Sequence, residues 1–284
     1  MATIAENLQT ILNIKSDIKN AIIAKGVSVA DSDGFGTYAS KIQSIETGTA
    51  TTIDVAADGI KFYTAKRITE IPSYYNFDNV TNMSNMFYEC NSLTSVPQIN
   101  STTITIMLST FYNCYNITTI PLIDTSKVTN MENMFYGCSK LTTVPALNTS
   151  KCETFRNMFC SCNQITTIPE MDWSGYKGSY GGSEVFGVSY NYAKNIENIG
   201  GFKDAGKSYT SSNNNNAYKD IIICYNPKLT YQSCMNVINK VYDMNLNTQN
   251  TYTPKIRFHK TPYALLSAED IAIATSKGWS VVNA

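Results

Sequence analysis

A repeat of 24 residues constrains this sequence more than any other feature. Three residue types recur at that spacing: Phe87, Phe111, Phe135 and Phe159; Cys90, Cys114, Cys138 and Cys162; and Pro97, Pro121, Pro145 and Pro169. Copies that keep one register indicate a small structural unit, which can bury its apolar face only against its neighbours. The sequence therefore predicts a stack of 24-residue coils.

Each unit contains two periodicities in succession, and the third copy shows them best. The apolar residues of its first half follow one face of a helix: Val128, Met131, Met134, Phe135 and Cys138. Thr129 and Glu132 have the spacing of a capping box, so a short helix or helical turns are expected. Residues 141–145 are rich in β-branched side chains and end in a proline, which predicts a short strand. The expected fold is α/β, with a parallel sheet on one side of the coils and helices on the other.

The repeat pattern between Val80 and Ser174 is M-F-x-x-C-x-x-[LI]-T-x-[VI]-P. This pattern resembles the BspA-like leucine-rich repeats of bacterial surface proteins and of gut bacteriophage proteins. The resemblance implies a leucine-rich-repeat solenoid that binds other molecules.

The remaining sequence extends and closes this stack. Less regular coils are expected at residues 67–72, 195–199 and 221–224. A C-terminal cap is expected from a helix over 229–244, a strand over 255–258 and a helix over 267–278. Thr230 and Ser267 have the residue types of helix N-caps, and Gly278 suits a helix C-terminus. The Lys277-Gly278-Trp279 turn resembles the terminal coil of the same repeat family. The repeat domain with its cap is assigned to residues 49–284.

Residues 1–48 do not follow the repeat. An apolar stripe at helical spacing precedes Gly26. The residues of this stripe that are candidates for attaching the chain to another protein are Ile4, Leu8, Ile11, Ile18 and Ile22. With a second short helix around Tyr38 to Ile45, the segment would form a hairpin too small to bury this stripe alone. Its K-x-x-I-x-x-A-I-x-x-K-G-V core is similar to N-terminal segments of gut (crAss-like) bacteriophage virion proteins. The resemblance implies that residues 1–48 attach the chain to other virion proteins.

Composition narrows the classes of function. The 22 basic and 22 acidic residues balance, so no cationic surplus is present for binding nucleic acid or an anionic membrane. His259 is the only histidine, which argues against histidine-based triads and histidine-rich metal sites. No carboxylate pair recurs and no phosphate-binding glycine loop follows a strand, so neither an enzyme nor a cofactor is expected. The N-terminus does not resemble a secretory signal, and no run approaches the roughly 18 apolar residues of a membrane span. Synthesis in a cytoplasm is expected.

The repeated cysteines have the spacing of a ladder that could hold metal. They belong to the apolar face of each unit, however, where cysteine acts as a small core residue. Cys152, Cys160 and Cys162 lie close in sequence, but no second pair follows at zinc-binding spacing. A structural role is therefore expected, with neither zinc nor disulfides.

Two rows of side chains outside the core repeat from coil to coil and are the candidate ligand-binding residues. The third position of each strand should face outward: Ser95, Thr119, Thr143 and Thr167, with Glu70 and Asn198 beyond them. The residue after each core phenylalanine should stand at a corner of the coil: Tyr88, Tyr112 and Tyr136. Tyrosine supplies a large contact area at low entropic cost. A solvated sheet face and wet loops are the plainer interpretations of the same rows, and a tyrosine-rich region at 176–231 is a further candidate.

These features favour a structural or accessory virion protein of a bacteriophage, of the fibre or surface-decoration type. Residues 1–48 would bind other virion proteins, and the repeats would bind a glycan or protein on the host surface. The alternatives are a bacterial cell-surface adhesin with the same repeats and an intracellular protein-interaction scaffold. Nucleic acid and membrane are not expected as partners, and a homo-oligomer is left open.

Overall fold

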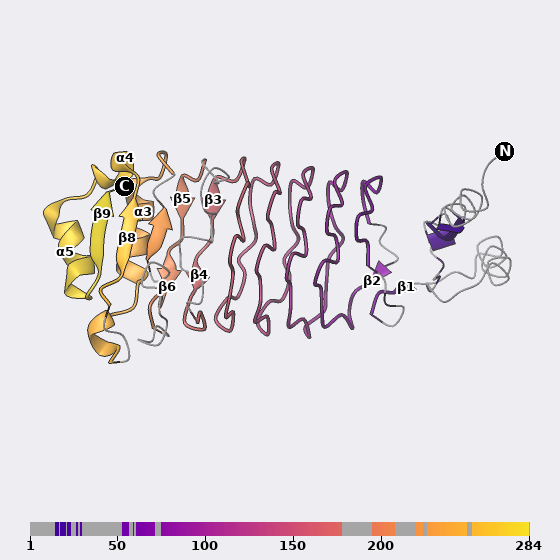
Figure 1. Ribbon diagram of the computed structural model, residues 1–284, viewed down its shortest axis with the longest axis horizontal. Coiled ribbons are helices and arrows are strands. Elements are labelled where there is room, and N and C mark those ends of the chain that lie inside the picture. Colours follow the sequence, from indigo (N-terminus) through magenta and orange to yellow (C-terminus); the bar gives the residue numbers. More distant parts are fainter. Residues whose placement is uncertain are drawn as a thin grey trace, which may run out of the picture.

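The molecule is an elongated stack of coils that runs from the N-terminal to the C-terminal part of the chain (Figure 1). It is a computed structural model of all 284 residues. The residues that it describes are 15, 16, 18–20, 22, 23, 27, 29, 53–56, 59, 61–71, 75–177, 195–207, 220–223, 226–248 and 252–283.

Successive coils pair in parallel on two sides of the stack. On one side, isolated bridges join Asn82 to Ile106, Ile106 to Asn130 and Asn130 to Thr154. On the other, Glu70 pairs with Ser95 and Thr143 with Thr167. Each partner lies about one repeat unit further along the chain, so the predicted stack of 24-residue coils in parallel register is present. We call the side with the Asn82–Ile106 bridge the turn side, and the side with the Thr143–Thr167 bridge the extended side.

Short strands extend this pairing at both ends of the regular repeats. At the N-terminal end, β1 (Ile53–Asp54) pairs with β2 (Tyr75–Asn76). At the C-terminal end, two strands of the fourth repeat pair with the following coil: β3 (Thr167–Ile168) pairs with β5 (Asn198–Ile199), and β4 (Met171–Asp172) pairs with β6 (Phe202–Lys203). The less regular coils expected around residues 67–72 and 195–199 therefore take part in the same parallel pairing.

Of the two alternatives expected for the first half of each unit, a short helix or helical turns, the structure shows turns and no helix. These residues form consecutive turns, in which the Met86 amide donates to the Met83 carbonyl and the Cys90 amide to that of Phe87. Left-handed residues with positive φ interrupt every unit: Asn85, Glu89, Ser109, Asn113, Asn133, Gly137, Asn157 and Ser161. An α-helix needs negative φ throughout, so these residues exclude it. Turns of this kind still place apolar side chains inward every three or four residues, which explains the misleading helical spacing.

The capping box expected at Thr129 and Glu132 is also wrong. The Glu132 amide donates instead to the side chain of Asn130, and the Thr129 hydroxyl donates to the carbonyl of Thr105 in the preceding coil. Gly137 occupies a left-handed position on the turn side that Glu89, Asn113 and Ser161 occupy in the other coils. Gly137 has φ +74°, and a Cβ there would lie 2.3 Å from the Asn113 side-chain oxygen.

Backbone amides on the turn side link each coil to the next. The amides of Met83, Asn85 and Phe87 donate forward to carbonyls of the following coil, at distances of 2.9 Å. The same bonds recur one and two units later. Every second amide thus points to the next coil while the intervening ones close turns within their own coil.

The core is a stack of aromatic rings, as predicted. Phe87, Phe111, Phe135 and Phe159 are buried, with centroid separations of 5.3, 5.7 and 5.8 Å between successive rings. Phe62 extends the stack by one coil, 5.5 Å from Phe87. The cysteines of the repeat lie beside this stack and are fully buried, which confirms that they are core residues.

The C-terminal cap is built from regular secondary structure. A parallel sheet is formed by β7 (Ile221–Ile223), β8 (Lys255–Phe258) and β9 (Ser280–Asn283). Between them lie α3 (Tyr231–Lys240), a 3-10 turn η3 (Met244–Leu246), α4 (Lys260–Tyr263) and α5 (Ala268–Ser276). Thr230 caps α3, and Ser267 forms a capping box with Asp270 at α5, so both predicted helices and their N-caps are confirmed. Trp279 is buried and donates its ring N–H to the Tyr242 carbonyl.

Part of the N-terminal segment is described. Helical residues between 15 and 23 lie beside the first coils in Figure 1, and Ile23 packs against their core. The Tyr75 hydroxyl donates to the Ile23 carbonyl over 3.4 Å. Ile22 is buried in a small cluster with Val27 and Val29, on which Ile18 packs. Ile4, Leu8, Ile11 and the expected second short helix lie outside the described residues.

Candidate functional site

The row of outward strand positions lies on the extended side of the coils. We call Ser95, Thr119, Thr143 and Thr167 the hydroxyl row. All are exposed, as predicted, while neighbours such as Leu93 and Leu141 are fully buried. Within the described part of the chain, none of these hydroxyls has a hydrogen-bond partner. The hydroxyl row is therefore available to a ligand, and equivalent strand positions in neighbouring coils are about 4.8 Å apart.

A second line of threonines beside the hydroxyl row has a different role. The amides of Thr94, Thr118, Thr142 and Thr166 each donate to the carbonyl of the equivalent threonine in the preceding coil. The hydroxyls of Thr94 and Thr142 donate to the same carbonyls. We call these residues the threonine ladder. The threonine ladder fixes the spacing of the coils. Its hydroxyls at Thr94 and Thr142 are engaged in hydrogen bonds, and the sequence alone does not distinguish these residues from those of the hydroxyl row.

The tyrosine row is a stack of rings that contact one another. Tyr88, Tyr112 and Tyr136 stack face to face, with centroids 4.7 Å apart and interplanar angles of 3° and 9°. Tyr63 extends the row at 4.9 Å from Tyr88. Each inner ring face is covered by the next tyrosine, so a ligand cannot insert between successive rings of this row. Burial first and the neighbouring Glu89 second raise the pKa of Tyr88, which keeps its phenol protonated.

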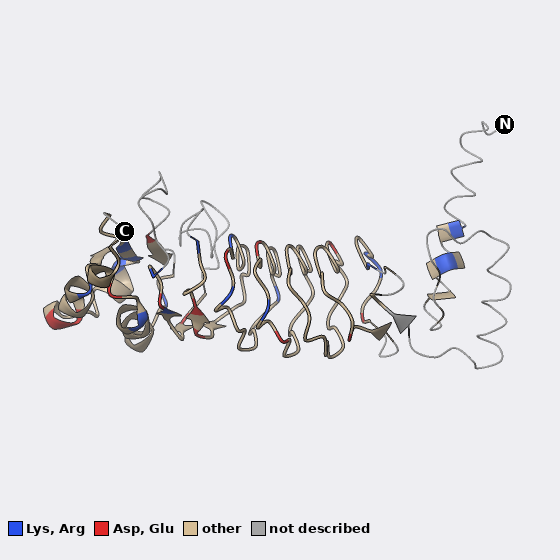
Figure 2. Cartoon of the chain, turned by 90° about the horizontal axis from the view of Figure 1, so that it is seen from below, with Lys and Arg blue, Asp and Glu red and all other residues tan. Residues whose placement is uncertain are grey.

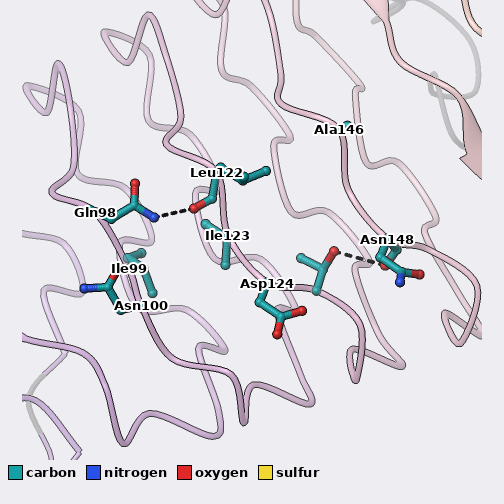
Figure 3. A pocket seen from close by; sticks show the side chains of 9 residues that line it. Gln98, Ile99, Asn100, Leu122, Ile123, Asp124, Ala146 and Asn148 are labelled. Atoms are coloured by element: carbon teal, nitrogen blue, oxygen red, sulfur yellow. Dashed lines mark hydrogen bonds between the residues drawn. The ribbon is translucent and has the colours of Figure 1, made fainter.

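The structure adds a groove that sequence reasoning missed. It crosses three coils on the extended side and is lined by Gln98, Ile99, Asn100, Leu122, Ile123, Asp124, Thr125, Ala146 and Asn148, with a volume of about 450 Å³ (Figure 3). We call it the coil groove. Its residues follow the hydroxyl row by three positions along the same extended stretch, as Ala146 follows Thr143.

The coil groove results from one small side chain. Equivalent positions of four coils hold Gln98, Leu122, Ala146 and Glu170. Leu122 is 62% exposed and extends toward the coil of Ala146, where the missing side-chain volume leaves the hollow (Figure 3). The Gln98 amide donates to the Leu122 carbonyl over 2.6 Å and holds the other edge. Ala146 was the available sequence signal, because it interrupts a row of longer side chains.

Polar side chains at one coil position form the rim of the groove. They are Asn100, Asp124 and Asn148. Asp124 accepts from the Ser126 amide, and that hydrogen bond is the main cause of a lowered pKa, so Asp124 is ionised at neutral pH. Asn148 accepts from the Ser150 amide and hydroxyl with its carbonyl oxygen. Each of these two side chains is thus held by its own turn with one polar atom left for a ligand.

The cysteine ladder does not form a reactive or metal-binding site. Cys90, Cys114 and Cys138 donate their Sγ–H to carbonyls of Phe62, Phe87 and Phe111, at 2.9 to 3.1 Å. Burial raises the pKa of Cys90 to about 11 and those of the deeper thiols further. Buried protonated thiols are poor nucleophiles and poor metal ligands. Among the described residues, no group of three His, Cys, Asp or Glu side chains could hold a metal ion.

Charged residues are sparse and of both signs along the described coils (Figure 2). Several are paired across coils, including Lys203 with Asp172 and Lys177 with Glu153. His259 caps α4, where its Nδ1 accepts from the Thr261 amide. Of the helices within the described ranges, none is long and apolar enough to cross a membrane.

The fold and site define a repeat protein with an exposed polar side. The family described as "Mycoplasma protein of unknown function, DUF285" matches residues 41–123, 59–173 and 105–199, which together span more than half of the chain. The chain belongs to this family, whose repeats are of the BspA-like leucine-rich kind.

Two further comparisons complete the findings. A solved structure described as "Crystal structure of T. pallidum Leucine Rich Repeat protein (TpLRR)" is 13% identical, with a TM-score of 0.31, over 51% of this chain and 78% of that one. No curated protein matches the chain.

Proposed function

We propose that this chain is a structural or accessory virion protein of a bacteriophage, of fibre or surface-decoration type. Its coils form a leucine-rich-repeat solenoid that binds a glycan or protein on the host surface, without catalysis. Residues 1–48 attach it to other virion proteins.

The hydroxyl row carries the binding part of this proposal. Four exposed hydroxyls stand at one coil position, with no partner among the described residues. An extended ligand that meets several such positions gains from their sum, because later contacts form at high local concentration. Charged residues are sparse along the described coils, so binding should depend little on salt (Figure 2).

The attachment part rests on the sequence of residues 1–48. Its helical spacing and its likeness to phage N-terminal segments support a docking role for Ile4, Leu8 and Ile11. Ile18 and Ile22 already pack within a small apolar cluster, and Ile23 contacts the first coil. A variant that replaces Ile4, Leu8 and Ile11 with serine therefore tests docking with less damage than deletion of the segment.

Particle incorporation tests the proposal. We would produce the phage with the wild-type chain or the triple serine variant and probe purified particles with an antibody against the repeats. Wild-type chain in the particles and loss of the variant are expected. Wild-type chain absent from particles contradicts the virion role, and a variant incorporated equally well contradicts attachment through these residues.

A second candidate is a bacterial cell-surface adhesin. The match to a family of Mycoplasma proteins favours it, because those repeats are encoded by cells. Surface labelling of the producing bacterium separates the two, since the adhesin is labelled on intact cells and the virion protein on particles.

A further inference from the structure

We propose that the coil groove is a subsite for one sugar ring of an uncharged glycan, an inference that specifies the ligand class of the proposed binding function and rests on it. The groove crosses three coils, is open to solvent and has the volume range in which proteins hold small ligands. It lies next to the hydroxyl row, which can contact the continuation of the same glycan chain.

The charge of the groove selects an uncharged ligand. Asp124 is the only charged residue among those that line it, and it is ionised. An anionic polymer would be repelled by this carboxylate. A polycation would find a single carboxylate, whose charge the nearby Lys127 opposes.

The polar atoms of the rim suit hydroxyl groups, which donate and accept at once. One carboxylate oxygen of Asp124 and the side-chain oxygen of Asn148 accept hydrogen bonds within their own turns. The second Asp124 oxygen can therefore accept from a ligand, and the Asn148 amide nitrogen can donate to one. Asn100 has no hydrogen-bond partner among the described residues and offers both. Hydrogen bonds to the Asp124 carboxylate are charge-assisted, so they are stronger than those between neutral groups.

The apolar part of the groove suits the C–H face of a sugar ring. Ile99 and Ile123 are buried beneath it, while Leu122 and Ala146 form one wall. The tyrosine row cannot supply this contact, since its inner ring faces are covered by one another. The groove is therefore the place on this side where a ring can lie against carbon atoms and reach polar groups.

Filling the groove tests the inference on the full-length chain. The variant is Ala146→Phe, and the matched control is Asn163→Phe, which adds the same ring at an exposed position outside the groove. The probes are immobilised hexasaccharides of glucose, mannose, galactose and N-acetylglucosamine, with heparin as an anionic control and host envelope protein as a peptide control. Circular dichroism verifies folding, and Asn100→Ala serves as a milder second variant.

We expect the wild-type chain to bind at least one uncharged hexasaccharide and to ignore heparin. Ala146→Phe should weaken that binding by about tenfold or more, Asn100→Ala by less, and Asn163→Phe should leave it unchanged. Glycan binding that both groove variants retain overturns the subsite while the binding function stands. Binding only to envelope protein overturns the glycan assignment, and binding to no host material overturns the proposed binding function as well.

Discussion

The coils between residues 80 and 166 and the cap between residues 220 and 283 are stabilised in different ways. The coils contain no helix, are joined by isolated bridges and by single backbone hydrogen bonds between coils, and repeat the same phenylalanine, cysteine and tyrosine contacts. The cap has helices, a parallel sheet, a capping box at α5 and an ion pair between the buried Asp220 and the partly exposed Arg257.

The difference shows two solutions to the same packing problem. A coil in the middle of the stack has a neighbour on each face, so identical side chains can stack on one another. The last coil lacks one neighbour, and longer helices must cover its open face. Mutations in the coils should therefore remove contacts with two neighbours, whereas those in the cap should act on one.

The largest effect is expected for Phe135→Ala in the middle of the core stack. The ring is fully buried between Phe111 and Phe159, so truncation leaves a cavity that costs about 3 to 5 kcal/mol. Equilibrium urea unfolding measures this cost. Phe135→Leu is the control and should lose much less, and a cost for Phe135→Ala below about 1 kcal/mol would show that the stack is not the main core.

Asp220→Ala should have the next largest effect, and it acts in the cap. The Asp220 carboxylate is 1% exposed and accepts two hydrogen bonds from Arg257, one from the Tyr252 hydroxyl and one from the Lys255 amide. Since Arg257 keeps access to water, the cost should be about 2 to 3 kcal/mol. Hydrogen exchange should show faster opening of β7 and β8, and equal acceleration in the coils would contradict a local role.

Alkaline pH should destabilise the coils through their thiols. Burial raises the pKa of Cys90 from 9.0 to about 11, so between these values the unfolded chain loses a proton that the folded chain keeps. Stability is thus unaffected below pH 9 and falls as pH rises to 11, by about 1 kcal/mol per pH unit for this thiol. Urea unfolding of wild type and Cys90→Ala at pH 8, 9, 10 and 11 checks this, and equal slopes for both would refute it.

The smallest effect is expected for Ser267→Ala at the start of α5. The mutation removes the hydroxyl that accepts from the Asp270 amide, at a cost of about 1 kcal/mol. Thermal unfolding measures the change, and Ser267→Asp should restore most of it because aspartate also caps helices. A full loss in the aspartate variant would mean that the cap acts through something other than this bond.

Much of the fold could be predicted because its contacts are repeated in the sequence. The register of Phe87 and its equivalents fixed the core, and the caps at Thr230 and Ser267 were recognisable from residue type alone. The outward direction of Thr143 followed from the alternation with its buried neighbours.

The missed features depend on backbone geometry that apolar spacing does not reveal. Asn85 and Asn133 adopt positive φ, which turns an apparent helix into consecutive turns, and asparagine at a recurring position was the signal for it. The coil groove depends on the absence of side-chain atoms at Ala146, and the tyrosine faces are lost only because successive rings coincide in space. To predict the groove and the stacking of the tyrosine rings, one must know the distance between successive coils. The sequence does not give that distance.

The direction of the hydrogen bonds between coils has a consequence for how such a chain can change length. On the turn side amides donate both forward, as from Asn85 to Leu108, and backward, as from Thr129 to Thr105, and on the extended side Thr118 donates backward to Thr94. Every coil thus offers its neighbours the same donors and acceptors. Duplication or loss of a whole 24-residue segment would leave each remaining bond between coils with an equivalent partner. The length of the stack can therefore increase or decrease by one coil at a time. The number of side chains in the hydroxyl row changes with it.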